Sequence, residues 1–282
     1  MDLETWACPG CFSRLEPEGS GLRCTSEGHG FPVRDGLPVL LRPEDEGLLR
    51  EADAYVAAWK HDTLAPPKGS ALDLPFVSSP YWRPKARSLE ALLEILGPAA
   101  GRRVADMGAG TGWLSYRLTQ AGFRCYATDI AADGEVGLGA ARAYDATRHG
   151  FERAVASLER WPFAAGSIDV AVCNASLHYL ADARPAIAEA ARVLGPGGVF
   201  VVMNDPVHSD PGSAHRAAHD FKDRMRAGGG SGLLVDGHRH FVASEFERDL
   251  RTQFPRVTRH DPDFGIGFRA SRALKSDRKS VV

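Results

Sequence analysis

The sequence lacks any long apolar run and any strong excess of charge of one sign. No stretch approaches the roughly 20 consecutive apolar residues of a membrane-spanning helix, although 44% of the 282 residues are hydrophobic. The first ten residues, MDLETWACPG, lack the basic and apolar regions of a secretory signal peptide. The formal net charge is only −2, which disfavours a surface coated uniformly for nucleic acid. These absences predict a soluble, cytoplasmic protein without a membrane partner.

Cysteine is scarce, and its distribution disfavours a disulfide framework. The chain has five cysteines, an odd number, and three of them lie in the first 24 residues near a histidine. Such clustering is typical of a metal site. The candidate ligands are spaced C-x2-C-x12-C-x4-H and comprise Cys8, Cys11, Cys24 and His29. Four protein ligands of this kind fit tetrahedral zinc and close its shell, so we predict a structural zinc ion. Four unrelated residues are the alternative.

The chain divides into three predicted zones without an internal repeat. Residues 1–41 are rich in turns, contain the cysteine cluster, and end in a strand, a turn and another strand. Residues 42–80 form a partly helical connector whose second half contains proline and glycine. Residues 81–275 alternate apolar helices with short β-rich segments, with an insert expected around 207–240. A flexible tail is expected at 276–282.

The alternation after residue 81 predicts an α/β fold, a Rossmann-like doubly wound sheet covered by helices on both faces. Strands are predicted over 103–107, 123–130, 151–157, 167–175 and 197–206. Helices are predicted over 85–96, 113–121, 135–144 and 183–194. Ligands of such sheets bind at the carboxyl ends of the strands, so a site is expected at that edge.

A glycine-rich loop follows the first of these strands, in the stretch VADMGAGTGW. The three glycines, Gly108, Gly110 and Gly112, are spaced G-x-G-x-G. The dinucleotide fingerprint G-x-G-x-x-G lacks its third glycine here, because Trp113 takes that place, so NAD is the weaker interpretation. A tight turn without a ligand is the alternative. Glycine permits the backbone to approach a ligand closely, because no Cβ is in the way.

An acidic residue lies at the end of each of the first two predicted strands. Asp106 precedes the glycine loop, and Asp129 ends the second strand. Asp129 is placed to accept hydrogen bonds from two ribose hydroxyls, and Asp106 to meet an amino acid moiety. Acids at both strand ends suit a cationic ligand with a free ribose better than a pyrophosphate.

At this point the chain resembles the class I S-adenosylmethionine-dependent methyltransferases, of the type 11 group, over roughly residues 81–205. The resemblance rests on four motifs in order: VADMGAGTGW, ATDI, VASLERWPFAAGSIDVAVCNASLHYL and ARVLGPGGVFVV. It implies a Rossmann-like fold and S-adenosylmethionine as cofactor. The residues that it implies for cofactor binding are Asp106, Gly108, Gly110, Gly112 and Asn174 at the methionine part, Asp129 at the ribose and Ile130 at the adenine.

The sequence departs from the family pattern on the adenine side of the implied site. Where the family often has an aspartate that reaches the adenine amino group, this chain has Ser157. The backbone of Leu158 is then the remaining candidate for that contact. Alternatively, Ser157 and Asn174 are ordinary polar residues at strand ends.

His178 is the candidate general base, since it lies just beyond the fourth strand in NASLHYL and has an unperturbed pKa of ~6.5. A base is optional, because alignment of the acceptor with a reactive methyl group carries much of the barrier reduction. Alternatively, His178 only shapes the pocket. Tyr81 and Trp82 form either an aromatic lid or core anchors for the first helix.

The N-terminal zone is similar to the zinc ribbon of the bacterial large-subunit rRNA guanine-N1 methyltransferases, through CPGC followed by a cysteine and a histidine. The stretch FPVRDGLPVLL is more similar to the small activator proteins of tRNA and rRNA methyltransferases. An rRNA or tRNA substrate docked by the ribbon is therefore one alternative, and a non-catalytic methyltransferase-like partner protein is another. Because basic residues in the ribbon are few and interspersed with acids, we expect a methyltransferase that acts on a small molecule.

Overall fold

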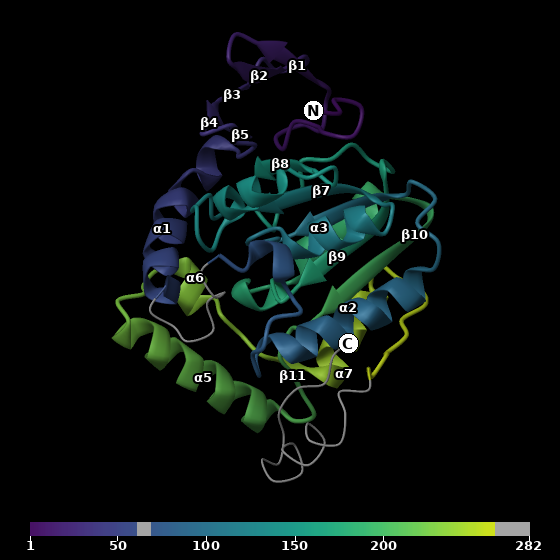
Figure 1. Ribbon diagram of the computed structural model, residues 1–282. Helices are drawn as coiled ribbons and strands as arrows, with labels where there is room; N and C mark the ends of the chain where they lie inside the picture. The colour runs from purple at the N-terminus through teal and green to yellow at the C-terminus, as the bar shows by residue number, and fades with distance from the viewer. Residues whose placement is uncertain (61–68, 263–282) are drawn as a thin grey trace.

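The computed structural model describes residues 1–60 and 69–262. The tail expected at 276–282 and the end of the third predicted zone lie outside the described residues. The centre is a five-stranded sheet in the order β10-β9-β6-β7-β8, with every neighbouring pair parallel (Figure 1). Its strands are β6 (Arg103–Met107), β7 (Arg124–Asp129), β8 (Glu152–Val155), β9 (Ile168–Asn174) and β10 (Leu194–Met203). The predicted doubly wound α/β sheet is confirmed, and its strand order reverses between β6 and β9.

Helices cover both faces of this sheet, so the central residues of its strands are mostly apolar and buried. On one face, α2 (Trp82–Leu96) and α3 (Trp113–Gln120) pack against Val104, Val170 and Val172. On the other face, α4 (Arg184–Val193) and α7 (Ala243–Arg251) pack over the alternate strand residues Ala105, Ala171 and Cys173. The two faces therefore bury successive residues of the same strands, as the period of two requires.

The helix predicted over 135–144 is instead a 3-10 helix, η3 (Leu138–Tyr144). The difference arises at Gly137, which lies against the preceding loop. A Cβ on Gly137 would come within 2.4 Å of the Ala131 carbonyl oxygen. Glycine also weakens an α-helix by about 1 kcal/mol relative to alanine. Close packing on the loop therefore replaces the first turns of the expected helix.

The N-terminal zone consists of short antiparallel strands, shown above β8 in Figure 1. A three-stranded sheet contains β1 (Leu15–Glu18), β2 (Gly21–Cys24) and β3 (Gly30–Phe31). A hairpin of β4 (Val33–Arg34) and β5 (Leu37–Pro38) follows, where a strand, a turn and a strand were expected. Val39 then forms a parallel bridge with Val155, and the Leu40 N–H donates to the Val155 carbonyl at 2.8 Å. The N-terminal zone thus continues the edge of the main sheet.

Trp6 packs the first residues of the chain against the sheet. Its side chain is only 1% exposed and packs between Tyr126 and Phe163, with ring centroids 5.8 and 4.7 Å away. Its indole N–H donates to the Glu152 carboxylate at 2.6 Å. Apolar residues of the N-terminal zone belong to the same buried cluster as one face of the sheet. The zone therefore shares the core of the larger unit.

Two further segments lie beyond the carboxyl edge of the sheet. The connector contributes α1 (Gly47–Lys60). The segment after β10 contains β11 (Val207–His208), α5 (Pro211–Ala227), α6 (Leu233–Asp236) and β12 (Phe241–Val242). Figure 1 shows α1 beside α6, and their side chains share a small apolar cluster with α5. None of the described helices combines the length and apolarity needed to cross a bilayer.

Candidate functional site

A cavity of about 500 Å³ lies at the carboxyl ends of β6, β7 and β9. Its volume is typical of small-molecule and cofactor sites. The structure brings together most of the residues predicted for cofactor binding, and those that line the cavity are Gly108, Gly110, Asp129, Ile130, Ser157, Leu158 and Asn174. Three other predicted residues do not line it, namely Asp106, Gly112 and His178.

The three glycines of the loop differ in what surrounds them, although all have positive φ. A Cβ on Gly108 would come within 2.4 Å of the Ser176 Cβ, and one on Gly112 within 2.7 Å of the Phe151 ring. These two positions are therefore closed by the protein itself. A Cβ on Gly110 would have only the Val136 carbonyl oxygen nearby, at 3.6 Å. Gly110 is the position where a side chain would enter the cavity.

Asp129 closes the glycine loop onto the end of β7. One carboxylate oxygen accepts the Gly110 N–H at 2.7 Å, and the other accepts the Ala131 N–H at 2.8 Å. Burial raises the pKa of Asp129 above its ordinary value, and these N–H groups oppose part of the rise. Each oxygen has a second lone pair. The carboxylate can therefore accept two further hydrogen bonds from a ligand in the cavity.

Three N–H groups of the loop, those of Gly108, Ala109 and Gly110, are bonded to the end of β7. Both Gly108 and Ala109 donate to the Thr128 carbonyl at 2.9 Å, while Gly110 donates to Asp129. Carbonyl oxygens of the loop can accept hydrogen bonds from a ligand, and such acceptors suit a cationic amino group.

Asp106 lies beneath the loop and is fully buried. One of its oxygens accepts the Ser115 hydroxyl at 2.8 Å, while the other has no hydrogen-bond partner in the described part of the chain. Burial raises the pKa of Asp106 to about 7. A buried carboxylate oxygen without a partner is costly, so this atom marks a place where a ligand group would be stabilising.

Four aromatic residues also line the cavity, and we call them the aromatic wall: Tyr55, Trp59, Tyr81 and Tyr179. Tyr55 stacks on Trp59 at 6.1 Å, meets Tyr179 edge-on at 5.1 Å, and hydrogen-bonds the Tyr179 hydroxyl. Tyr81 thus faces the cavity, whereas Trp82 is a core anchor packed on Trp113. Sequence reasoning missed the two residues on α1, whose signal was a pair of aromatics four apart in AYVAAWK.

His178 lies next to the cavity and is held by a buried aspartate. Its Nδ1 is 2.6 Å from a carboxylate oxygen of Asp205, which also accepts the His178 backbone N–H at 3.0 Å. The ring packs against His238 at 4.9 Å. The neighbouring side chain, Tyr179, is the one that lines the cavity. Sequence reasoning did not find Asp205, which lies on the segment after β10.

The predicted metal ligands converge in the N-terminal zone. The ligand atoms of Cys8, Cys24 and His29 all lie within 4.8 Å of one another. The Cys11 sulfur is 3.4 Å from that of Cys24, and the Cys8 sulfur is 3.6 Å from His29 Nδ1. Zinc bound tetrahedrally with Zn–S bonds of ~2.3 Å places sulfurs roughly 3.8 Å apart. Three of the four predicted ligands, Cys8, Cys24 and His29, therefore form one cluster, and Cys11 lies beside Cys24 without belonging to that set. None of the five cysteines, all of which lie among the described residues, forms a disulfide.

The similarity to known proteins lies mainly in the segment that forms the central sheet. Residues 105–202 match the family model described as a methyltransferase domain. A demethylmenaquinone methyltransferase of Mycolicibacterium paratuberculosis is 33% identical over 122 residues, which cover 43% of this chain and 47% of that protein. An uncharacterized methyltransferase of Mycobacterium bovis is 35% identical over 133 residues, covering 46% and 48%. The chain thus spans about half the length of these relatives.

A solved structure also resembles the sheet and its helices. The YcgJ protein of Bacillus subtilis matches with a TM-score of 0.50 at 24% identity, covering 60% of this chain and 68% of that one. This likeness confirms the predicted Rossmann-like fold.

Proposed function

We propose that the protein is an S-adenosylmethionine-dependent methyltransferase whose cofactor binds in the cavity at the carboxyl edge of the sheet. The observation that carries the proposal is the glycine loop closed onto Asp129, with Gly110 open toward the cavity. This arrangement lies within the segment that matches a methyltransferase domain.

The residues present fit the cofactor. Asp129 would bind the ribose hydroxyls, and Ile130 would lie against the adenine, with Ser157 and Leu158 on its other side. Asn174 and the loop carbonyls would meet the methionine end. The unpartnered oxygen of Asp106 would interact with the methionine amino group, since that buried atom otherwise lacks a partner in the described residues.

When bound, S-adenosylmethionine supplies an electrophilic methyl group on a sulfonium. The chain itself contributes orientation and exclusion of water. The aromatic wall contributes apolar surface for an acceptor, and aromatic faces also favour a nearby positive charge. We propose that His178, held by Asp205, positions Tyr179, which lines the cavity and whose hydroxyl is bonded to Tyr55.

The charge of the cavity favours a small acceptor without an anionic group. Among the described residues that line it, the charged side chains are Asp129, Glu159 and Asp236, and none is lysine, arginine or histidine. A phosphate on the acceptor would enter beside these carboxylates without a compensating cation from the described lining, at a large desolvation cost. We therefore propose a small apolar or aromatic acceptor rather than an RNA nucleotide. A relative named for demethylmenaquinone is consistent with this class.

For the N-terminal cluster we propose a structural zinc ion held by Cys8, Cys11, Cys24 and His29. Four ligands leave no open position for catalysis. The other two cysteines, Cys125 and Cys173, are buried and form no disulfide within the described part of the chain, and reduced cysteines support a cytoplasmic location.

Calorimetry with S-adenosylhomocysteine, the demethylated product, tests the cofactor site. Gly110→Ala should weaken binding by about tenfold or more, because its Cβ would enter the cavity, and Asp129→Ala by about 10- to 100-fold through loss of charge-assisted hydrogen bonds. Gly101→Ala is the matched control, since Gly101 also has positive φ (+71°) and open surroundings. Binding as tight in both cavity variants as in the unaltered protein would refute the site.

An acceptor screen separates the candidate functions. The protein is incubated with methyl-labelled cofactor and either a metabolite extract or total RNA. Label in a small molecule supports the proposal. Label in RNA, with binding that weakens at higher salt and on Arg23→Glu in the ribbon, would show an RNA methyltransferase. Tight cofactor binding with label in neither fraction would favour a non-catalytic partner protein.

A further inference from the structure

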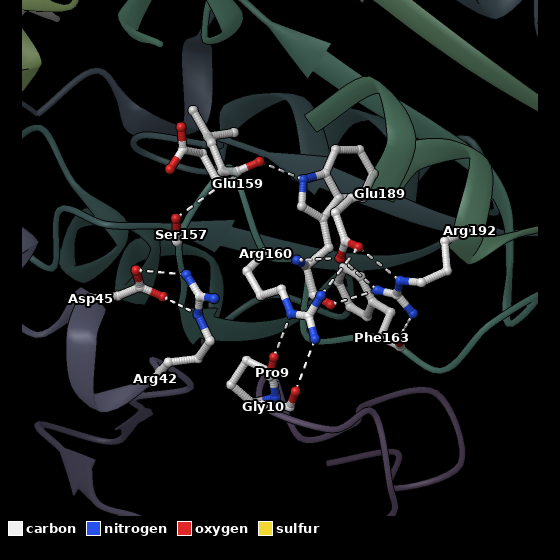
Figure 2. Close-up of polar contacts among 12 residues, drawn as sticks. Pro9, Gly10, Arg42, Asp45, Ser157, Glu159, Arg160, Phe163, Glu189 and Arg192 are labelled. Atoms are coloured by element: carbon white, nitrogen blue, oxygen red, sulfur yellow. Dashed lines mark hydrogen bonds and ion pairs between the residues drawn. The ribbon is translucent and has the colours of Figure 1, made fainter. Parts of the chain in front are cut away.

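The turn that carries two of the proposed zinc ligands is bound to the loop on the adenine side of the cavity. We call residues 8–12 the metal turn and residues 157–160 the adenine-side loop. Ser157, Leu158 and Glu159 line the cavity. The next residue, Arg160, points toward the metal turn, as Figure 2 shows. It donates from Nε to the Pro9 carbonyl at 2.6 Å and from a terminal nitrogen to the Gly10 carbonyl at 2.8 Å.

These two carbonyls belong to the residues between Cys8 and Cys11. They converge on a single guanidinium because the turn is tightly closed, with the Phe12 N–H bonded to the Cys8 carbonyl at 2.8 Å. The planar fork of arginine suits two such acceptors, whereas a lysine ammonium does not reproduce its geometry. The contact of Arg160 with the metal turn therefore depends on the conformation that the zinc ligands share.

Phe12 makes a second contact between the metal turn and the sheet unit. Its ring lies between two guanidinium groups, with Arg160 Cζ 3.8 Å and Arg192 Cζ 3.5 Å from the ring centroid. Its φ is +62°, a conformation that a bulky residue adopts only when its surroundings enforce it. The stacked cations and the closed turn provide such surroundings.

Glu189 of α4 forms ion pairs with both arginines. The residue is only 8% exposed. Its carboxylate accepts the Trp161 N–H at 2.9 Å and pairs with Arg192 at 2.8 Å and Arg160 at 4.0 Å. Arg192 also donates to the Trp161 carbonyl at 2.8 Å. A partly buried, connected network thus runs from α4 through the chain that follows the adenine-side loop to the metal turn (Figure 2).

We infer that Arg160 is a positioning residue that couples the zinc site to the cofactor site. The inference rests on the proposed function. With the ion bound, the closed metal turn holds Arg160 and thereby fixes the adjoining adenine-side loop. Without zinc, the two cysteines of the metal turn are no longer linked to the other ligands. The Pro9 and Gly10 carbonyls that accept hydrogen bonds from Arg160 are then no longer fixed. Binding free energies are coupled reciprocally, so zinc tightens cofactor binding and the cofactor tightens zinc binding, by a factor in the range of about 5 to 150.

The test is a thermodynamic cycle on the full chain. The Kd of S-adenosylhomocysteine is measured by calorimetry with zinc bound, after removal of zinc by a chelator, and after zinc is restored. In the unaltered protein we expect removal to weaken binding about tenfold, reversibly. In Arg160→Ala we expect weak binding in both states and a ratio near one. Arg23→Ala is the matched control, because Arg23 pairs with Glu18 at 2.9 Å within the β1–β2 hairpin, and it should behave as the unaltered protein.

Measuring zinc affinity with and without S-adenosylhomocysteine distinguishes a loss of coupling from poor folding of the variant. Saturating S-adenosylhomocysteine should tighten zinc about tenfold in a chelator competition with the unaltered protein, and not with Arg160→Ala. Arg160→Lys keeps the charge near Glu189 but not the fork, so its coupling should be intermediate.

The outcomes separate this inference from the proposed function. A Kd that is unchanged on zinc removal from the unaltered protein, or an Arg160→Ala variant with full zinc dependence, would overturn the coupling and leave the function standing. Absence of S-adenosylhomocysteine binding in every state would overturn both.

Discussion

The carboxyl edge of the sheet and the N-terminal zone each hold a candidate ligand site, yet they are stabilised in different ways. At the sheet edge, strands bury apolar residues on both faces, and the loop at Gly108–Gly112 is fixed by hydrogen bonds to the end of the adjacent strand. The N-terminal zone has strands of two to four residues, and its apolar side chains join the cluster on one face of the sheet. A segment of this size cannot form a sufficient core alone. The candidate metal site therefore depends on the sheet unit, whereas the cavity is formed mainly by the sheet's own elements.

Replacing Trp6 by alanine should have the largest effect on this shared core. Removal of a fully buried tryptophan should lower the free energy of unfolding by about 3–5 kcal/mol, because it leaves a cavity against Tyr126 and Phe163. Urea unfolding measures the change. Val33→Ala is the control, since Val33 is in the same zone but 38% exposed, and it should change stability by less than about 0.5 kcal/mol. Equal effects of the two substitutions would show that the N-terminal zone does not share the core.

Loss of the metal should affect the N-terminal zone far more than the sheet. We expect about one zinc per chain by elemental analysis, and near-complete loss of it in Cys24→Ser. Amide exchange should then accelerate in β1–β3 while β6 and β9 stay protected, because only the former depend on the ion. Cys125→Ser, a change at a buried thiol of β7, should retain the metal. Zinc retained in Cys24→Ser would refute the ligand assignment.

Cofactor binding should depend on pH through Asp106. Its raised pKa of about 7 means that the carboxylate form, which attracts a cationic amino group, grows as pH rises. Affinity for S-adenosylhomocysteine should therefore increase about fivefold between pH 6 and pH 7. Calorimetry checks the slope, and Asp106→Asn should abolish it. A pH dependence unchanged in the variant would assign the titration to another group.

The pH dependence that Asp106 gives to folding stability is opposite in direction to the one it gives to cofactor affinity. Because the pKa of Asp106 is raised in the folded state, its protonated form favours folding, and that contribution is lost as pH rises through about 7. The ligand-free protein should thus lose stability over the pH range in which it gains affinity. Urea unfolding without ligand, compared with Asp106→Asn, measures this.

The sequence predicts the sheet edge better than it predicts the contacts between segments that lie far apart in the chain. Strand periodicity and the glycine spacing predict the sheet, the glycine loop and Asp129, because these features follow strand ends that the topology brings together. The family resemblance adds further lining residues, namely Ile130, Ser157, Leu158 and Asn174. The aromatic residues of α1 and the bond between Asp205 and His178 were not predictable in this way, since they join segments far apart in sequence. The metal ligands follow from spacing, but the binding of Arg160 to the metal turn does not, because backbone carbonyls leave no signal in the sequence. The predicted zone boundaries, the zinc ion and the roles of the site residues stay predictions.

The smallest effects are expected at two neighbouring residues of the sheet edge, His178 and Tyr179. Tyr179→Phe removes only the hydroxyl that bonds Tyr55, so kcat/KM for the acceptor found by label transfer should fall about threefold to tenfold, the value of one hydrogen bond. His178→Ala should lower turnover by a similar amount, because the ring that Asp205 fixes no longer supports Tyr179. Neither should change the Kd of S-adenosylhomocysteine, and Tyr116→Phe, in a tyrosine stacked on Tyr144 away from the cavity lining, should change nothing. If His178 acts only through Tyr179, the double variant loses no more than the larger single loss, whereas multiplied losses would show that His178 acts independently of Tyr179.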